Sequence, residues 1–160
     1  MMQWTGPFLH VVVVDWSPIK DEASANAFAA AIEASPRRLF GGGTSISGAI
    51  DFSRTLLAGS PFRAIRQIID VSGDGSNNSG RDVTQARDEA VRDGVGINGL
   101  PILTVEPGLD RYYRDYVIGG PGAFMIPVKD YDNFADAVLK KLINEIAATQ
   151  PPTFSRTAKR

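Results

Sequence analysis

The chain has no cysteine and only one histidine among its 160 residues. Without cysteine it forms no disulfide, offers no thiolate to a metal and has no thiol nucleophile. The single histidine, His10, lies in an apolar run, which is typical of a packed residue rather than of a catalytic base. No triad of serine, histidine and acid is predicted, so we expect the chain not to be an enzyme.

An excess of charge and long apolar runs are also missing. The 17 basic and 18 acidic residues are well mixed and give a net charge of −1. No basic surface for nucleic acid or for an anionic membrane is therefore predicted. No apolar run approaches the ~20 residues of a membrane span, and the first residues lack the basic start and apolar stretch of a secretion signal. As written, the sequence predicts a soluble protein and leaves its compartment open.

The apolar periodicity predicts strands that alternate with helices. The first two expected strands would form a hairpin, and the others a mostly parallel sheet with helices on both faces, which is an α/β fold. The expected strands are Met1–Trp4, Leu9–Trp16, Arg66–Ser72, Val95–Leu100 and Ala123–Val128, and the expected helices are Asp21–Ala34, Ser45–Ala58, Arg81–Asp93, Leu109–Val117 and Tyr131–Ala147.

The length suits one domain with a buried core, which we expect over residues 1–148. Residues 149–160, with two prolines and a basic end, are predicted to form a disordered tail. The Arg66–Ser72 strand is so apolar that we expect it at the centre of the sheet.

Two segments that lie 30 residues apart (74 − 44) each bring an oxygen-bearing side chain to a loop. In the first, three glycines precede Thr44, which opens a helix; in the second, a β-branched run ends at Asp74 and Gly75. Hard cations such as Mg²⁺ prefer oxygen ligands. Two such loops at one edge of a sheet can hold a divalent cation.

Simpler interpretations exist for both segments. The Gly41–Thr44 segment also suits a turn followed by a helix cap, and Asp74–Asp82 is rich in residues that favour turns. A phosphate loop of the Walker type is excluded because its lysine is absent. A calcium loop that starts at Asp70 fails because Arg81 stands where the bidentate glutamate belongs.

The two segments resemble the second and third motifs of the metal-ion-dependent adhesion site of von Willebrand factor A domains. Longer stretches resemble a bacterial subgroup of unknown function, namely Pro36–Thr44, Ser60–Arg63, Ile69–Asn78 and Tyr112–Phe124. The resemblance implies a Rossmann-like fold in which Thr44 binds the cation directly and Asp74 acts through water. It also implies a protein partner that offers a carboxylate, and full-length relatives that are exported. The rim facing this partner would contain Ser45, Ser72, Asn77, Asn78 and Arg81.

The sequence departs from this family at its first motif, Asp-x-Ser-x-Ser, which has no counterpart here. Asp15-Trp-Ser17-Pro-Ile19 is a poor substitute, because the 29 residues from Asp15 to Thr44 (44 − 15) hold only one helix. Gly73 also stands where the family often has threonine. The resemblance therefore implies a domain that lacks its first strand and helix.

A missing central strand would leave hydrogen bonds of its neighbours unpaired. Either the Met1–Trp16 hairpin slides against the Arg66–Ser72 strand, or another chain donates a strand. We expect a protein-interaction domain with an incomplete cation site. The alternatives are a structural remnant or mis-started fragment without binding activity, and a hydrolase that uses the hydroxyl of Thr44 or Ser45.

Overall fold

The structure, a computed structural model, describes residues 1–148 as a mixed α/β fold. The predicted tail over residues 149–160 lies outside this part. The elements are β1 (Met2–Trp4), β2 (His10–Val12), α1 (Glu22–Glu33), α2 (Ile46–Ala58), β3 (Gln67–Gly73), α3 (Val83–Arg92), β4 (Val95–Pro101), α4 (Leu109–Tyr112), a π-helical turn η1 (Tyr113–Val117), a 3-10 turn η2 (Tyr131–Asn133) and α5 (Phe134–Ala148).

The predicted N-terminal hairpin is confirmed, although its second strand is shorter than expected. β1 and β2 pair antiparallel, with Met2 opposite Val12 and Trp4 opposite His10. Beyond β2 the amides of Val13 and Val14 both donate to the carbonyl of Met1, so the regular ladder ends there. His10 is a packed residue, as its sequence position indicated, because its ring stacks on Phe52 at 4.9 Å between centroids.

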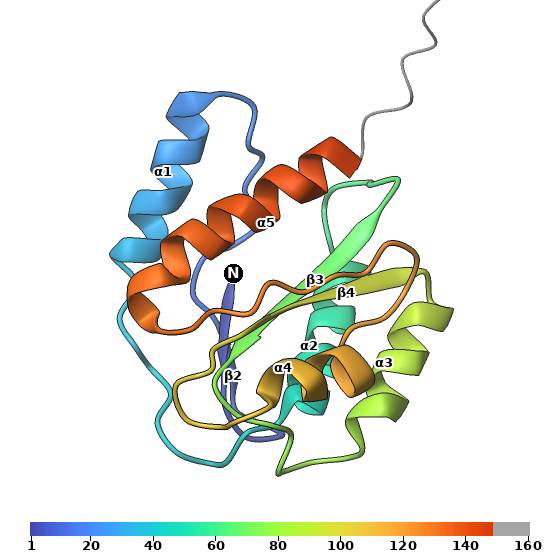
Figure 1. The fold of residues 1–160 in the computed structure, drawn as a ribbon. Helices are drawn as coiled ribbons and strands as arrows, with labels where there is room; N and C mark the ends of the chain where they lie inside the picture. The colour runs from blue at the N-terminus through green and yellow to red at the C-terminus, as the bar shows by residue number, and fades with distance from the viewer. Residues whose placement is uncertain (149–160) are drawn as a thin grey trace, which may run out of the picture.

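A parallel pair of strands, β3 and β4, forms the centre of the fold. Their register runs from Gln67 opposite Val95 to Gly73 opposite Pro101. Figure 1 shows α5 crossing one face of this pair, while α2 and α3 lie on the opposite face. The predicted helices on both faces are therefore present. The sheets themselves are small, since the parallel pair and the antiparallel hairpin are separate in the described chain.

The main core lies between β3–β4 and the helices α2 and α3. Alternate strand residues point into it, which is why Ile69, Val71 and Ile97 are buried while Asp70 is not. The other face of β4 packs its Leu100 against α5. The remaining members of the main core are Ile46, Ile50, Val83, Ala86, Ala90, Val95, Leu109, Tyr113 and Val117.

The helix ends follow from local capping residues. The Ser45 side chain accepts a hydrogen bond at the start of α2, and that of Asp82 does the same for α3. Gly94, with φ of 82°, follows α3 in the left-handed conformation that favours glycine at the end of a helix. These boundaries agree with the predicted helices to within two residues.

The expectation that Arg66–Ser72 lies at the centre of a sheet was wrong. In the described part of the chain β3 pairs with β4 alone, so it is an edge strand. Nor does the hairpin slide against it, because β1 and β2 pair only with each other. An apolar strand shows burial of its two faces, and it carries no information about hydrogen bonding along its two edges.

The predicted strand Ala123–Val128 was also wrong as a continuous strand. The segment pairs through two isolated bridges, between Gly99 of β4 and Met125 and between Ile102, just after β4, and Val128. Pro121 lies two residues before this segment and Pro127 within it, and proline has no amide N–H to donate to a ladder. The chain here is a strap along the outer edge of β4.

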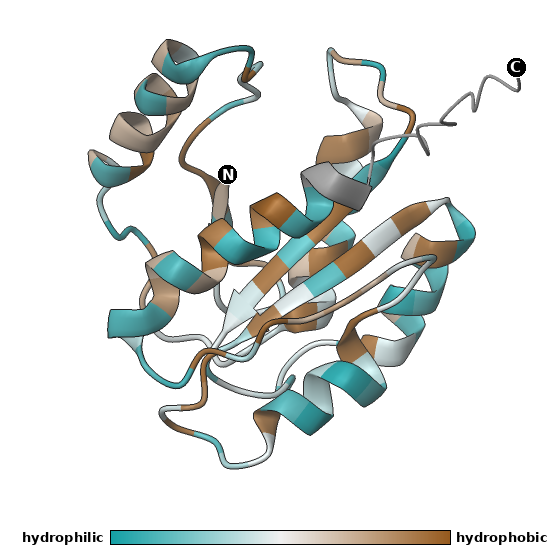
Figure 2. Cartoon of the chain, turned by 45° about the horizontal axis from the view of Figure 1, so that its top comes forward, coloured by the Kyte–Doolittle hydropathy of each residue, from teal (hydrophilic) through white to brown (hydrophobic). Residues whose placement is uncertain are grey.

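Helix α1 stands apart from the rest of the fold in Figure 2 and buries no residue. Its apolar side chains are at most half-buried, as at Ala25, Phe28 and Ile32. A capping box at Asp21 and Ser24 fixes its first turn. Local propensity and capping therefore define this helix more than core packing does.

Candidate functional site

The two predicted loops meet at the carboxyl end of β3, where Thr44 is tied to the loop that follows this strand. The amide of Thr44 donates to Oδ1 of Asn78 at 2.8 Å, and the amide of Asn78 returns a bond to the carbonyl of Thr44 at 2.9 Å. Ser79 donates to the same carbonyl at 3.2 Å. These bonds fix the start of α2 against the Gly73–Gly80 segment.

Gly43 is needed where these two segments approach each other. Its φ of 80° lies in the left-handed region that favours glycine, and a methyl group there would lie 3.0 Å from Oδ1 of Asn78. Any larger residue would therefore press on the atom that holds the amide of Thr44. The glycine run found in the sequence has a structural reason at this position.

Ser45, predicted at the partner rim, lies beneath the surface instead. It is fully buried and accepts a hydrogen bond of 3.1 Å from the amide of Gly48. Ser47, also buried, receives support from Asn77, whose Oδ1 accepts from the Ser47 amide at 3.0 Å. Ser45 and Asn77 thus shape the loop edge from below, while Asn78 is exposed on it.

Asp74, the second predicted ligand, faces the turn that precedes α5. The hydroxyl of Tyr131 donates to its Oδ2 at 2.9 Å. This bond to a carboxylate raises the pKa of Tyr131, because the phenolate would lose the bond and repel the negative charge. Oδ1 of Asp74 has no hydrogen bond among the described residues.

Glu106 joins this edge although the sequence did not single it out. Its Oε2 accepts from the amide of Ser76 at 2.7 Å. A methyl group on Gly75 would lie 3.8 Å from the same oxygen and 3.5 Å from Oγ1 of Thr44, so both oxygens flank this glycine. The available signal was its place in the loop after β4, since the ends of neighbouring parallel strands meet at one edge.

Arg81, another predicted rim residue, takes part in a network of ion pairs between α2 and α3. Its guanidinium contacts Asp51 at 2.6 Å and Glu89 at 2.7 Å, and Arg54 contacts Glu89 at 2.9 Å and Asp93 at 2.5 Å. Hydrogen bonds from Arg81 and then from Arg54 lower the pKa of Glu89 from 4.5 to about 2. Arg81 therefore anchors the loop to the helices behind it.

Two tyrosines support the edge from the core side. Tyr112 accepts a hydrogen bond of 3.2 Å from the amide of Asn77. The hydroxyl of Tyr113 is buried beside Gly73 and has no partner among the described residues. Burial raises the pKa of Tyr113, and the negative charges of Asp74 and Glu106 act in the same direction.

The oxygen donors at this edge suit a hard cation but are few. They are the hydroxyl of Thr44 and the carboxylates of Asp74 and Glu106, which are ligands that Mg²⁺ accepts. No cluster of three or more acidic or histidine side chains that would hold a metal occurs among residues 1–148. Ser72 lies one strand position before Gly73 and is half-buried. The described side chains at this edge therefore fall short of a complete set of metal ligands.

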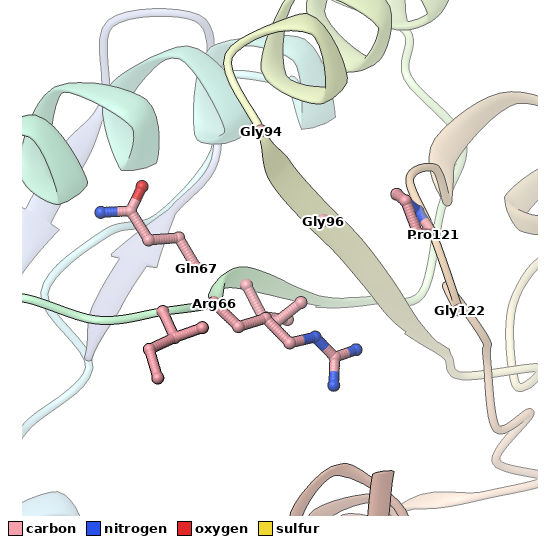
Figure 3. A pocket seen from close by; sticks show the side chains of 8 residues that line it. Arg66, Gln67, Gly94, Gly96, Pro121 and Gly122 are labelled. Atoms are coloured by element: carbon pink, nitrogen blue, oxygen red, sulfur yellow. The ribbon is translucent and has the colours of Figure 1, made fainter. Parts of the chain in front are cut away.

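Hollows in the surface occur at the opposite end of the parallel strands. One of about 380 Å³ lies at the amino ends of β3 and β4. Figure 3 shows Arg66 and Gln67 leaving the start of β3 in opposite directions, as neighbours on a strand do. The residues that line this hollow are Ile65, Arg66, Gln67, Ile68, Gly94, Gly96, Pro121 and Gly122. None of the predicted site residues borders it.

A family model for a protein of unknown function, DUF1194, matches residues 1–150. The chain belongs to the DUF1194 family. No curated protein and no solved structure matches it. Within residues 1–148 no helix has the length and apolar character needed to cross a membrane. The family model thus covers nearly the whole chain but assigns no function to it.

Proposed function

We propose that the chain is a protein-interaction domain of the von Willebrand factor A type, which meets its partner at the carboxyl end of β3. The observation that carries this proposal is the pairing of Thr44 with Asn78, which brings two loops from distant parts of the sequence together. The resemblance of both loops to the adhesion motifs of that family supports it. So does the parallel β3–β4 pair with helices on both faces.

A divalent cation, with Mg²⁺ as the first candidate, would sit between Thr44 and Asp74. Thr44 offers its hydroxyl and Asp74 the oxygen that Tyr131 leaves free. Mg²⁺ keeps several waters when a protein offers few ligands, so the affinity should be weak in the isolated chain. A carboxylate from the partner would replace one of these waters and strengthen binding.

A catalytic role has less support from the geometry. The hydroxyl of Ser45 is buried and serves as a helix cap, and the ring of His10 stacks on Phe52. A nucleophile needs a base within hydrogen-bond reach. Among residues 1–148 no hydrogen bond joins the hydroxyl of Ser45 or of Thr44 to His10.

The test is a titration of the ¹⁵N-labelled protein with MgCl₂, followed by NMR. We expect shifts in the millimolar range at Thr44, Asp74 and Gly75, and we expect Asp74→Ala to abolish them. Asp136→Ala, on the first turn of α5, is the matched control and should leave them unchanged. Absence of shifts at 20 mM Mg²⁺ would contradict the proposal.

A second titration addresses the partner. The probe is the blocked peptide acetyl-Gly-Glu-Gly-amide, with the glutamine peptide as its control. We expect the glutamate peptide to bind at the same edge only when Mg²⁺ is present. Equal behaviour of the two peptides would instead favour a structural remnant that binds nothing at this edge.

A further inference from the structure

The outer edge of β3 presents backbone groups that have no strand beside them. The carbonyl of Gly73 accepts a hydrogen bond from the amide of Ile102, so Gly73 faces β4. Strand residues alternate in direction, and the amides and carbonyls of Ile68, Asp70 and Ser72 must therefore face away from β4. Among residues 1–148 no other strand pairs with β3. Three successive donor and acceptor pairs thus lie along one open edge.

This edge lacks the usual protection of an exposed strand. The seven residues of β3, Gln-Ile-Ile-Asp-Val-Ser-Gly, include no lysine and no proline. Their single charge is the carboxylate of Asp70, which is already bonded to Lys141 of α5. A regular apolar strand with an open edge readily pairs with another extended chain.

The surroundings of the edge are apolar and hollow. A hollow of about 250 Å³ lies beside the start of β3, where Trp16, Leu57 and Phe62 line it together with Ile68. Trp16 and Phe62 are 43% and 47% exposed, which is unusual for such large apolar side chains. An extended segment along β3 would cover them.

The far end of the edge has its own unsatisfied group. The hydroxyl of Tyr113 is buried, has no partner in the described chain and lies against Gly73. Trp4 of the hairpin approaches the same glycine, with ring atoms 3.5 Å from the place of a methyl group. The hairpin therefore bounds the edge at this end, and a single extended segment fits there better than a folded domain.

The charges at the start of β3 add a further requirement. Arg66 lines both hollows, and it makes no ion pair among residues 1–148. An acidic residue at the matching end of an incoming segment would pair with it. The charge of Asp70 needs no such partner, because Lys141 contacts it.

We propose that the open edge of β3 is a docking groove for an extended, apolar segment of a second polypeptide that carries an acidic residue next to Arg66. Backbone hydrogen bonds to Ile68, Asp70 and Ser72 hold the segment in register. Its side chains alternate between the core side, beside Leu57, and the side of α5. The groove is separate from the Thr44–Asp74 edge, and its binding does not require a cation.

The probe is the blocked peptide acetyl-Glu-Val-Ile-Val-Thr-Val-Glu-amide, added in EDTA so that no cation contributes. The fluorescence of Trp4 and Trp16, the two tryptophans of the chain, reports binding because both border the edge. Amide hydrogen exchange then locates the peptide. We expect exchange at Ile68, Asp70 and Ser72 to slow at least about tenfold, while Ile69 and Val71 are protected already.

Two controls separate strand pairing from general adhesion to an apolar surface. The same peptide with alternate N-methyl groups cannot form the ladder and should not bind. Ser72→Pro removes a donor that faces the open edge and leaves the β4 ladder intact, so it should weaken binding more than Ser72→Ala does. Arg66→Ala should weaken binding about threefold to tenfold, and Arg92→Ala should not.

Three results would overturn the proposal. Equal binding of the N-methylated peptide would show that no strand forms. Slow exchange at Ile68, Asp70 and Ser72 in the free monomer would show that the chain covers its own edge. Protection that appears only with dimerisation, measured by analytical ultracentrifugation, would assign the edge to a second copy of the chain.

Discussion

The hydroxyl of Tyr131 donates a hydrogen bond of 2.9 Å to the carboxylate of Asp74, and the two residues are 57 positions apart in the sequence. The bond connects the turn before α5 to the loop after β3. It occupies one oxygen of the residue that the sequence marks as a cation ligand. The ionisation of Tyr131 therefore reports on the state of Asp74.

Asp74→Ala is expected to lower the pKa of Tyr131 toward its ordinary value of 10.0. The wild-type pKa is raised because the hydrogen bond stabilises the protonated phenol and the carboxylate repels the phenolate. Titration of ¹³C-labelled tyrosine by NMR measures this change. Mg²⁺ should act in the same direction in the wild type if it binds at Asp74, because a cation favours the phenolate. A Tyr131 titration that ignores saturating Mg²⁺ would place the cation elsewhere.

Glu89→Gln should destabilise the protein at neutral pH, and the effect should disappear in acid. The pKa of Glu89 in the folded protein is about 2, against an ordinary value of 4.5. A lowered carboxylate pKa contributes stability above about pH 4.5, and this contribution is lost as the pH falls toward 2. Thermal melting at several pH values should therefore show wild type and variant converging over this range. Glu33→Gln, on exposed α1, is the control, and a gap that stays constant with pH would contradict the prediction.

Much of the fold could be predicted from local sequence signals. The turn and cap expected at Thr44 mark the start of α2 to within one residue, because the structure caps this helix with Ser45. The ends of α3 lie close to the predicted ones, with Asp82 as its N-cap and Gly94 just after it. The hairpin likewise follows from two apolar runs around a turn. Signals of this kind involve residues a few positions apart, so a single amino-acid sequence is enough to identify them.

The pairing of strands could not be predicted in the same way. The apolar residues of β3 indicate burial of its faces, but the strand beside each edge is a long-range choice. The 123–128 segment was predicted as a strand from its apolar residues. Pro121 and Pro127 limit the hydrogen bonds that it can form with β4, so it pairs only at isolated bridges. Both errors come from relations that hydrophobic periodicity does not encode.

The sequence predicted only part of the candidate site, because local motifs identify loops and do not identify their long-range partners. The sequence identified the loops of Thr44 and Asp74, and the structure joins the first of them to Asn78. It did not indicate that Arg81 pairs with Asp51 of another helix, or that Glu106 turns toward Gly75. Charged residues in loops look like surface residues until their long-range partners are known.

The last prediction concerns Lys141, a lysine that is only 2% exposed. Its ammonium contacts Asp70 of β3 and, at 2.5 Å, Glu145 one turn further along α5. Asn98 donates to the same Glu145 oxygen at 2.6 Å. Lys141→Met would remove the ammonium that contacts Asp70, beneath a helix that covers the sheet.

Removal of one partner from a fully buried pair costs about 3–5 kcal/mol. The side chain of Asp70 is 41% exposed, so solvent reduces the penalty, and we expect Lys141→Met to cost about 2–3 kcal/mol at pH 7. Burial already raises the pKa of Asp70, and loss of the ammonium should raise it further. The destabilisation caused by Lys141→Met should therefore shrink as the pH falls through the raised pKa of Asp70, because Asp70 becomes neutral there.

Urea unfolding at pH 7 and at pH 4 measures both effects. Lys140→Met, at the exposed neighbouring position, should change the free energy of unfolding by less than about 0.5 kcal/mol. Adding Asp70→Asn to Lys141→Met should restore part of the stability, because it removes one uncompensated charge. A double variant no more stable than Lys141→Met would mean that the lysine acts through packing against Phe124, whose ring centroid lies 5.6 Å from its nitrogen, rather than through charge.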